Sequence, residues 1–526
     1  MDSSTVIIGS GLAALWCAKA CIARGLRPLI LDGGDTLDAS RQSLIDRLRA
    51  TPPTLWSTAD RLAIQDTPRS DRRLPKKRVF GSDYLYAHTR LNMQRHNATG
   101  DVTLALGGFS NAWAGALFPM IADDMQQWPL SREALDPAYR RVLQEIPLST
   151  AEDDLQPFFP SHAIPCPALP DAAQITLLKH RLQRHRLTLQ QHGLLFGQSR
   201  LAIRAAADNH SPGCQLCGNC LSGCPTGAVY NAGQEMLRLQ QRGEVDYRPG
   251  MIVDWLEERD TTVQLHGRHA DDTPFRLACS RLFLAAGALG SSRILIHSPF
   301  WSGEPLRLVC SDKFFVPCLQ GHGVPGIVDE ARHVFPGLFL LLRNEGISPC
   351  HLLIQVSPMN ALAMNAVGLN PVTMGSRMKR LLNPLLSRGL FFWGSLHSRD
   401  SSHLEVHRGE TPTGPWRVVG RENEGSGLIV KRLMRLFRGL RRQTGFVPLG
   451  MAAMLAGPGA GNHLGGSFPM VAGVPQRGQS DLLGRPGGLQ RVHLVDSSTF
   501  PSVTGTTIGL TIMANAWRIG SEAPEG

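Results

Sequence analysis

The residues best suited to chemistry are four cysteines that lie within eleven residues of one another and are followed directly by a proline. They are Cys214, Cys217, Cys220 and Cys224, with Pro225 after the last. Their spacing is that of the bacterial iron–sulfur run Cys-x2-Cys-x2-Cys-x3-Cys-Pro, in which thiolates converge on iron. We therefore predict an iron–sulfur cluster in the loop 213–231. In two-cluster ferredoxins the fourth cysteine of such a run serves the other cluster, so a three-iron and a four-iron cluster both stay open.

Two other interpretations of the cysteine run stay open beside the cluster. Zinc knuckles also use cysteines paired two residues apart, and a disulfide or four buried thiols is the simplest structural alternative. The other seven of the eleven cysteines are scattered without pattern, which is typical of a reducing compartment. The N-terminus shows no secretory leader, and no apolar run approaches the ~18–20 residues of a membrane span. We therefore expect a cytoplasmic protein.

A phosphate-binding turn is predicted near the N-terminus. A β-branched strand over 5–8 leads into Gly9-Ser10-Gly11-Leu12-Ala13-Ala14, an apolar helix, and a second strand over 29–31 that ends at Asp32. This is the order of a dinucleotide-binding unit. Gly9 permits the tight turn, Gly11 admits a pyrophosphate to the helix N-terminus, and Ala14 allows close packing of the helix on the strand. Asp32 would accept hydrogen bonds from ribose hydroxyls.

Further segments have the composition of turns that follow strands. The pair Gly107-Gly108, with Asn111 after it, lets a loop pass against a flat ring without side-chain clash. A buried strand over 282–284 runs into a turn at Ala286-Gly287. Near the C-terminus His463 lies in a glycine-rich loop over 461–467, and a strand over 493–495 ends at Asp496-Ser497. A lone histidine is usually structural, so a catalytic role for His463 depends on the segment in which it lies.

The order and approximate spacing of these motifs resemble the glucose–methanol–choline family of flavoenzymes almost end to end. The resemblance implies that the chain binds FAD. The residues that it places at the cofactor are Gly9, Gly11, Ala14, Asp32, Gly107, Gly108, Asn111, Val253, Ala286, Gly287, Asp496 and Ser497. The cysteine loop is similar to a narrower branch, the bacterial FAD-dependent sugar dehydrogenases with an iron–sulfur cluster. Its ligands would correspond to Cys214, Cys220 and Cys224, which makes Cys217 an addition of this chain.

The resemblance also implies how an alcohol would be oxidised. His463 would accept the hydroxyl proton while hydride leaves the carbon for the flavin, and an unperturbed pKa of about 6.5 suits histidine to this role. The family usually has a second His or Asn in the loop before the final helix, but the loop 504–510 has neither. Thr507, Thr506 and Asn462 are the candidates that would orient the hydroxyl.

The function implied by the resemblance is an FAD-dependent dehydrogenase that oxidises an alcohol group of a sugar or glycoside. Electrons would leave through the iron–sulfur cluster to an electron-accepting protein or quinone. Three alternatives stay open. They are an alcohol oxidase that reduces oxygen, an enzyme of long-chain or sterol alcohols, and a non-catalytic flavin-binding protein.

Length predicts two intimately joined domains, because 526 residues exceed the size of one hydrophobic core. We expect an α/β protein with a Rossmann-like FAD-binding domain over 1–300 and 451–526, the second part carrying the catalytic loop. An inserted α+β substrate domain over 301–450 would be built on an antiparallel sheet, with strands near 338–342, 352–356 and 390–393. Within the FAD-binding domain we expect a lid excursion over about 36–95 and a helical segment over about 128–204.

The formal net charge of +11 is concentrated in the segments 376–388 and 430–442. In the second, apolar residues recur at helical spacing among arginines, which predicts a basic amphipathic helix. Such a helix either packs on the core with a solvated cationic face or contacts an acidic protein or an anionic surface such as the inner membrane. No nucleic-acid-binding motif accompanies the charge, so we expect no nucleic-acid partner.

Overall fold

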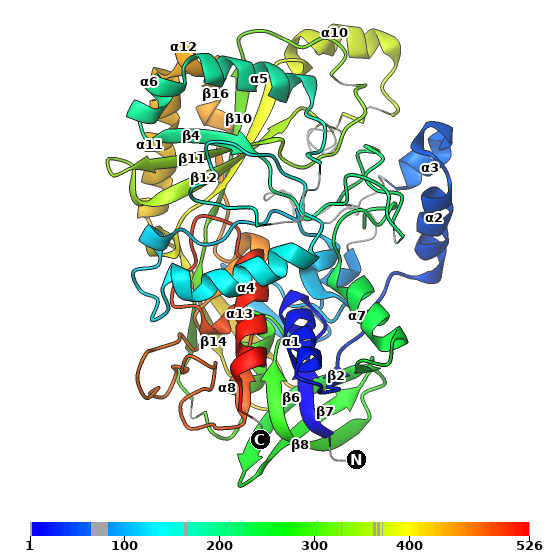
Figure 1. The fold of residues 1–526 in the computed structure, drawn as a ribbon, viewed down its shortest axis with the longest axis vertical. Helices are drawn as coiled ribbons and strands as arrows, with labels where there is room; N and C mark the ends of the chain where they lie inside the picture. The colour runs from blue at the N-terminus through cyan, green and yellow to red at the C-terminus, as the bar shows by residue number, and fades with distance from the viewer. Residues whose placement is uncertain are drawn as a thin grey trace.

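The computed structural model describes residues 3–64, 83–162, 167–209, 211–221, 223–301, 303–327, 329–360, 364, 369–370 and 372–524. Figure 1 shows an elongated molecule with one sheet near each end. Both chain termini lie at the end that carries the parallel sheet, and the antiparallel sheet lies toward the other end.

The parallel sheet has the order β5-β2-β1-β8-β7-β6, with β19 also paired to β8. Its strands are β1 Ser3–Ile8, β2 Leu29–Leu31, β5 Asp246–Arg248, β6 Met251–Arg259, β7 Thr262–His269, β8 Pro274–Leu284 and β19 Val492–Leu494. The pairs made by β1, β2, β5 and β19 are parallel, whereas β6, β7 and β8 form an antiparallel meander. Val6 and Ile7 of β1 are fully buried, as expected where both faces of a parallel sheet are covered.

Two helices cover this sheet beside the glycine turn. The helix α1, Leu12–Ala23, connects β1 to β2, and α13, Gly509–Glu522, packs along it. The two helices approach closely because Gly520 has no side chain: a Cβ there would lie 2.9 Å from the Cβ of Ala20. The predicted βαβ unit and the Rossmann-like architecture are therefore confirmed.

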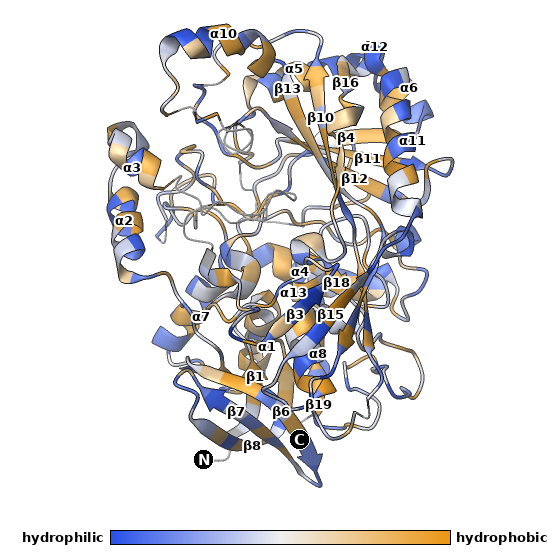
Figure 2. Ribbon diagram, turned by 180° about the vertical axis from the view of Figure 1, so that it is seen from behind, coloured by the Kyte–Doolittle hydropathy of each residue, from blue (hydrophilic) through white to orange (hydrophobic). Residues whose placement is uncertain are grey.

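The antiparallel sheet has the order β16-β10-β13-β12-β11-β4, with β17 also paired to β10. Its strands are β4 Leu194–Gln198, β10 Lys313–Gln320, β11 Leu338–Asn344, β12 Ser348–Pro358, β13 Gly389–Ser395, β16 Phe446–Pro448 and β17 Met454–Leu455. One face packs under α5 Ala173–Arg184 and α11 Gly425–Gly439 (Figure 2). Alternation along β10 sends Phe314 and Val316 to that core and Phe315 to the opposite face. The inserted antiparallel sheet is therefore confirmed.

A third sheet, ordered β18-β9-β14-β15-β3, lies between these two parts of the chain. Its strands are β3 Met93–His96, β9 Leu306–Cys310, β14 His403–His407, β15 Trp416–Arg421 and β18 Leu464–Gly465. The segment 301–450 thus divides between two sheets, and the antiparallel sheet takes β4 from the segment 128–204, predicted to be helical. Leu194 and Phe196 of β4 are buried by strand pairing with β11, which overrides the helical pattern around them.

The described residues also form eight further α-helices. They are α2 Ala39–Ala50, α3 Thr58–Ala63, α4 Arg132–Glu145, α6 Arg186–Gln191, α7 Ala232–Gln241, α8 Ala288–Ile296, α10 Ser376–Leu386 and α12 Arg441–Thr444. Of the predicted excursion 36–95, residues 65–82 lie outside the described part of the chain. In the described residues no helix is both long and apolar enough to cross a bilayer.

Candidate active site

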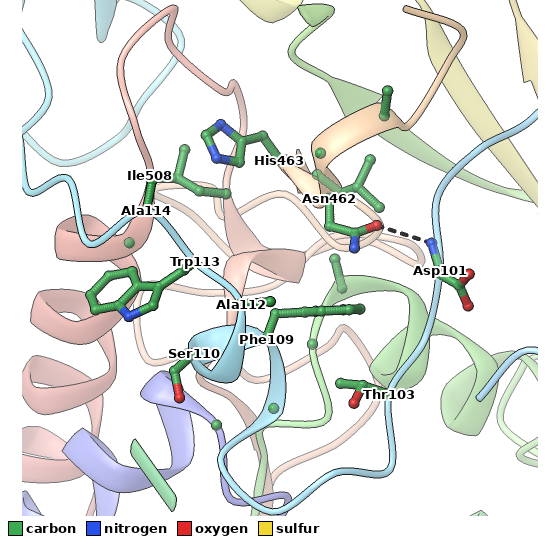
Figure 3. A pocket seen from close by; sticks show the side chains of 18 of the residues that line it. Asp101, Thr103, Phe109, Ser110, Ala112, Trp113, Ala114, Asn462, His463 and Ile508 are labelled. Carbon is green, nitrogen blue, oxygen red and sulfur yellow. Dashed lines mark hydrogen bonds between the residues drawn. The ribbon is translucent and has the colours of Figure 1, made fainter. Parts of the chain in front are cut away.

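A cavity of about 1990 Å³ lies between the parallel and the antiparallel sheet. This is larger than the roughly 300–1,000 Å³ of an ordinary small-molecule pocket. The glycine turn after β1 forms one part of its wall, and the loops around Phe109 and His463 form others (Figure 3). The cavity therefore has room for a dinucleotide and a substrate together.

The glycine turn forms a narrow cradle at one end of the cavity. Gly9 has a φ of +102°, and a Cβ there would come within 2.6 Å of the carbonyl oxygen of Ala285. Gly108 faces Gly11 across the cradle, and a Cβ on Gly108 would lie 3.3 Å from the Cα of Gly11. Only glycine suits the backbone and the space at Gly9, and glycine at position 108 keeps the passage open.

The N-terminus of α1 opens into this cradle. Gly11 is its N-cap, no side chain caps the helix, and its first turn has no acidic residue. The first backbone N–H groups of a helix have no partners within the helix and prefer an anion. The cradle thus fits the pyrophosphate of a dinucleotide.

Asp32 lies at the end of β2 and lines the same cavity. Its Oδ2 accepts hydrogen bonds from Ser10 Oγ at 2.7 Å, Tyr247 Oη at 3.0 Å and the backbone N–H of Gly34 at 3.2 Å. Burial raises the pKa of Asp32 to about 6, although these hydrogen bonds oppose the shift. The carboxyl group is therefore positioned to accept ribose hydroxyls, and its charge depends on pH.

Other predicted cofactor residues, from segments after the N-terminal βαβ unit, also line the cavity. Val253 of β6, the turn Ala286-Gly287 after β8, and Asp496 and Ser497 after β19 all line it. Asp496 is buried, and burial raises the pKa of its carboxyl group. Its oxygens accept from Ser291 Oγ and from the backbone N–H and hydroxyl of Ser498. These hydrogen bonds fix the carboxyl group of Asp496 beside the first turn of α8.

Three of the predicted cofactor residues do not line the cavity. Gly107 faces α7, where a Cβ would lie 2.5 Å from the backbone nitrogen of Gly233. Asn111 donates to the carbonyl oxygens of its own loop at Leu106 and Gly108, and Ala14 is buried in the core of α1. In the structure, Gly107 is packed closely against α7, Asn111 forms hydrogen bonds within its own loop, and Ala14 is part of the core.

His463 lies at the other end of the cavity, and its imidazole meets a lysine that the sequence did not reveal. Nζ of Lys313 lies 2.7 Å from Nδ1 of His463, and the same nitrogen also donates to Oγ of Ser395. All three residues line the cavity. Lys313 begins β10 and is 150 residues from His463 in the chain, so no local motif connects the two.

The two polar candidates beside the base are already engaged by the backbone. Oδ1 of Asn462 accepts from the backbone N–H of Asp101 at 2.9 Å (Figure 3). The hydroxyl of Thr507 donates to the carbonyl oxygen of Ala116 at 2.8 Å. Asn462 therefore keeps its amide N–H groups for donation, whereas Thr507 keeps only its capacity to accept. Thr506 is buried and bonds with Thr504 instead.

Aromatic rings from the antiparallel sheet cover the cavity near His463. Phe315 of β10 and Phe391 of β13 stack at 5.6 Å between ring centroids, and Trp393 lies 4.5 Å from Phe315. Gln355 of β12 and Asn360 add amide groups to the same wall. The sequence indicated strands over 352–356 and 390–393, but these apolar runs did not show which face of the sheet the cavity would use.

The cysteine loop borders the cavity through Gly218, Asn219 and Leu221 rather than through its thiols. Cys217 packs against the apolar cluster of α2 and α3, whereas Cys214 and Cys220 pack against a separate cluster. The run is thus divided between two apolar cores. In the part of the chain that is described, no group of three or more His, Cys, Asp or Glu residues is placed to hold a metal ion.

Burial also affects the thiols of Cys214, Cys217 and Cys220. Burial raises the pKa of Cys217 to about 12, and it raises the pKa of Cys214 and Cys220 as well. The described residues thus give no support to the predicted iron–sulfur cluster, and Ser222 of the loop lies outside them.

Comparison with known proteins adds one finding about the fold. No protein-family model matches the chain, and no curated protein sequence matches it. The chain is similar to the crystal structure of pyridoxine 4-oxidase from Mesorbium loti, with 14% sequence identity and a TM-score of 0.57. The match covers 99% of this chain and 98% of that one. At this identity, the likeness shows that the two proteins share a fold over their whole lengths.

Proposed function

We propose that this protein is an oxidoreductase of the glucose–methanol–choline type that oxidises an alcohol with noncovalently bound FAD. The observation that carries the proposal is a single cavity that joins the cradle at Gly9, Gly11 and Asp32 to the imidazole of His463. The full-length fold likeness to a protein named as an oxidase supports the same class of reaction.

The chemistry follows from the hydrogen bond between His463 and Lys313. When bound, FAD supplies the acceptor for the hydride that leaves the alcohol carbon. His463 takes the hydroxyl proton on Nε2, because Nδ1 is engaged by Lys313. Nε2 can accept a proton only while Nδ1 carries the hydrogen, and Nδ1–H then needs an acceptor. We infer that a neutral Lys313 amine is that acceptor and that it sets the tautomer of His463.

Asn462 is the better candidate to orient the substrate hydroxyl. Its Oδ1 accepts from the backbone N–H of Asp101, so its amide nitrogen remains to donate a hydrogen bond to a substrate in the cavity. The hydroxyl of Thr507 is turned to Ala116. Asn462 would therefore take the place of the second His or Asn that the family resemblance leads us to expect.

The cavity wall suits an alcohol with an apolar face and further polar groups. Phe315, Phe391 and Trp393 offer ring faces, while Gln355 and Asn360 offer hydrogen-bonding amides. A sugar or glycoside has this character, and we propose this substrate class. A long-chain or sterol alcohol is the alternative, since the aromatic wall would also receive an apolar chain.

Two candidate activities differ in the acceptor to which the reduced flavin would pass its electrons. Transfer to an external protein or quinone makes the protein a dehydrogenase, and transfer to oxygen makes it an oxidase, as the name of the similar structure suggests. Stoichiometric peroxide release separates the two. The iron–sulfur cluster rests on cysteine spacing alone, and iron and acid-labile sulfide analysis after anaerobic purification tests it directly.

The decisive experiment is an anaerobic screen in which sugars, glycosides, aliphatic alcohols and sterols are tested for bleaching of the bound flavin. One class should bleach it, and His463→Ala should keep its FAD while slowing bleaching by about 10²–10⁴-fold, the usual contribution of a general base. Purified protein that binds no FAD, or a His463→Ala variant that is reduced at the wild-type rate, would overturn the proposal.

A further inference from the structure

The helix α10 exposes an apolar face that the rest of the described chain does not cover. Met378, Leu381 and Leu385 are 49%, 74% and 57% exposed, and Leu386 is the only buried residue of the helix. Their spacing of three and four residues places them on one side of an α-helix. A stripe of large apolar side chains facing solvent is a feature that needs an explanation.

The neighbouring face of α10 holds the helix in this orientation. Leu382 and Leu386 pack in a small cluster with Met359 and Phe391. Nζ of Lys379 forms an ion pair with Asp329 at 2.6 Å. Because these contacts fix the rotation of the helix about its axis, the exposed stripe is directed outward by the fold.

Positive charge flanks the apolar stripe. Arg377 and Arg380 are exposed on α10, and the helix contains no acidic residue. Figures 1 and 2 place α12 at the same end of the molecule, and its Arg441 and Arg442 are exposed as well. This end of the protein thus combines apolar side chains with cationic ones.

The second basic helix, α11, is built differently. Its apolar residues Leu433, Met434 and Phe437 are buried against the antiparallel sheet, and its arginines face water. It is a core-packed helix with a solvated cationic face. The two basic segments are similar in sequence, but α10 exposes apolar side chains and α11 buries most of its own.

We propose that α10 docks this protein on the surface of an anionic lipid bilayer, with Met378, Leu381 and Leu385 in the interfacial layer and Arg377 and Arg380 at the headgroups. An amphipathic helix with an apolar face and basic flanks binds bilayers in this way. A second copy of the chain is a poor occupant, because two such cationic faces repel each other. The inference does not depend on the proposed reaction.

Docking of α10 would bring the bilayer to one side of the cavity. Phe391 packs against α10 within the cluster described above and also lines the cavity. Asn360, which precedes α10 in the chain, lines it too. A lipid surface at α10 is thus adjacent to the wall of the candidate active site.

The test is co-sedimentation of the full-length protein with vesicles of phosphatidylcholine, alone or mixed with phosphatidylglycerol. The wild type should bind the mixed vesicles at least about tenfold more tightly, and added salt should weaken this binding. Leu381→Glu/Leu385→Glu should reduce binding at least about tenfold, because it removes the apolar contact. Arg377→Gln/Arg380→Gln should reduce binding to the mixed vesicles by about 30-fold, as expected for two basic residues at an anionic surface.

Matched controls separate α10 from the overall charge and from general loss of structure. Leu187→Glu alters another exposed leucine, on α6, and Arg432→Gln/Arg435→Gln removes two exposed charges from α11; both should bind as the wild type does. Circular dichroism should show unchanged melting for every variant, with Leu381→Ala/Leu385→Ala as a milder pair if the glutamates unfold. Binding that survives both α10 variants, or that the α11 pair weakens equally, refutes the proposal. So does a wild type that pellets with no vesicle, a result that would favour an acidic protein as the occupant.

Discussion

Replacement of Lys313 by Met and by Arg should slow substrate oxidation by different amounts. The two side chains differ in the hydrogen bond that they can form with Nδ1 of His463. Methionine removes the partner of Nδ1 and leaves the ring free to take either tautomer. Arginine keeps a donor near Nδ1 but has no acceptor. It would hold the hydrogen of a neutral His463 on Nε2, which then cannot accept the hydroxyl proton.

The magnitudes follow from the 2.7 Å contact between Nζ and Nδ1. As Nε2 takes the proton, this hydrogen bond becomes charge-assisted, and such a bond contributes about 1.5–3 kcal/mol. At about 1.36 kcal/mol per tenfold change in rate, Lys313→Met should slow the step by about 10- to 150-fold. Lys313→Arg disables the base and should slow it by about 10²–10⁴-fold.

The assay is anaerobic stopped-flow reduction of the bound flavin at saturating substrate, repeated across pH. FAD occupancy measured by absorbance controls for loss of cofactor. Nitrogen NMR of labelled histidine reports the tautomer of His463 without turnover, with His463→Gln used to assign the signal. Because the two groups are coupled, apparent pKa values from the pH profile belong to the pair. A faster rate in Lys313→Arg than in Lys313→Met would show that Lys313 acts as a cation, and our reasoning would be wrong.

Two further predictions concern the cofactor cradle. Below pH 6 the carboxyl group of Asp32 is mostly protonated in the cofactor-free protein and cannot accept both ribose hydroxyls, so FAD affinity at pH 5 should be about tenfold lower than at pH 8. Calorimetric titration of the cofactor-free protein measures this, and Asp32→Asn should bind weakly with no such pH dependence. Gly9→Ala should lower the free energy of unfolding by more than the roughly 1–2 kcal/mol of a left-handed backbone, because its Cβ also meets Ala285. Gly25→Ala is the matched control, since Gly25 has a φ of +76° and nothing within 4 Å of an added Cβ; equal losses in denaturant unfolding would argue against the clash.

The elements predicted with success depend on local signals. The turn at Gly9 requires a positive φ and a close approach to the next strand, so its residue type reveals its geometry. The apolar runs over 338–342, 352–356 and 390–393 predicted strands, and these runs lie in β11, β12 and β13, where most of their residues are buried. Such patterns were enough to predict the Rossmann-like unit and the inserted sheet.

Other features were decided by packing between distant segments. The strand β4 looked helical by its surroundings, but pairing with β11 buries it. Gly107 resembles a cofactor glycine, yet the space that it leaves is filled by α7. The cysteine spacing fits iron ligation, while in the structure the loop packs on two apolar clusters, one that Cys217 contacts and one that Cys214 and Cys220 contact.

The sequence by itself determined the glycine turn after β1, the acid at the end of β2, and the histidine in its glycine loop, because each requires particular residue types within a short segment. Only the tertiary structure decided that Lys313 is the partner of His463 and that α10 rather than α11 keeps its apolar face in water. Both outcomes depend on contacts between elements far apart in the chain, and side-chain pairing and burial at that range leave no periodic trace in the sequence.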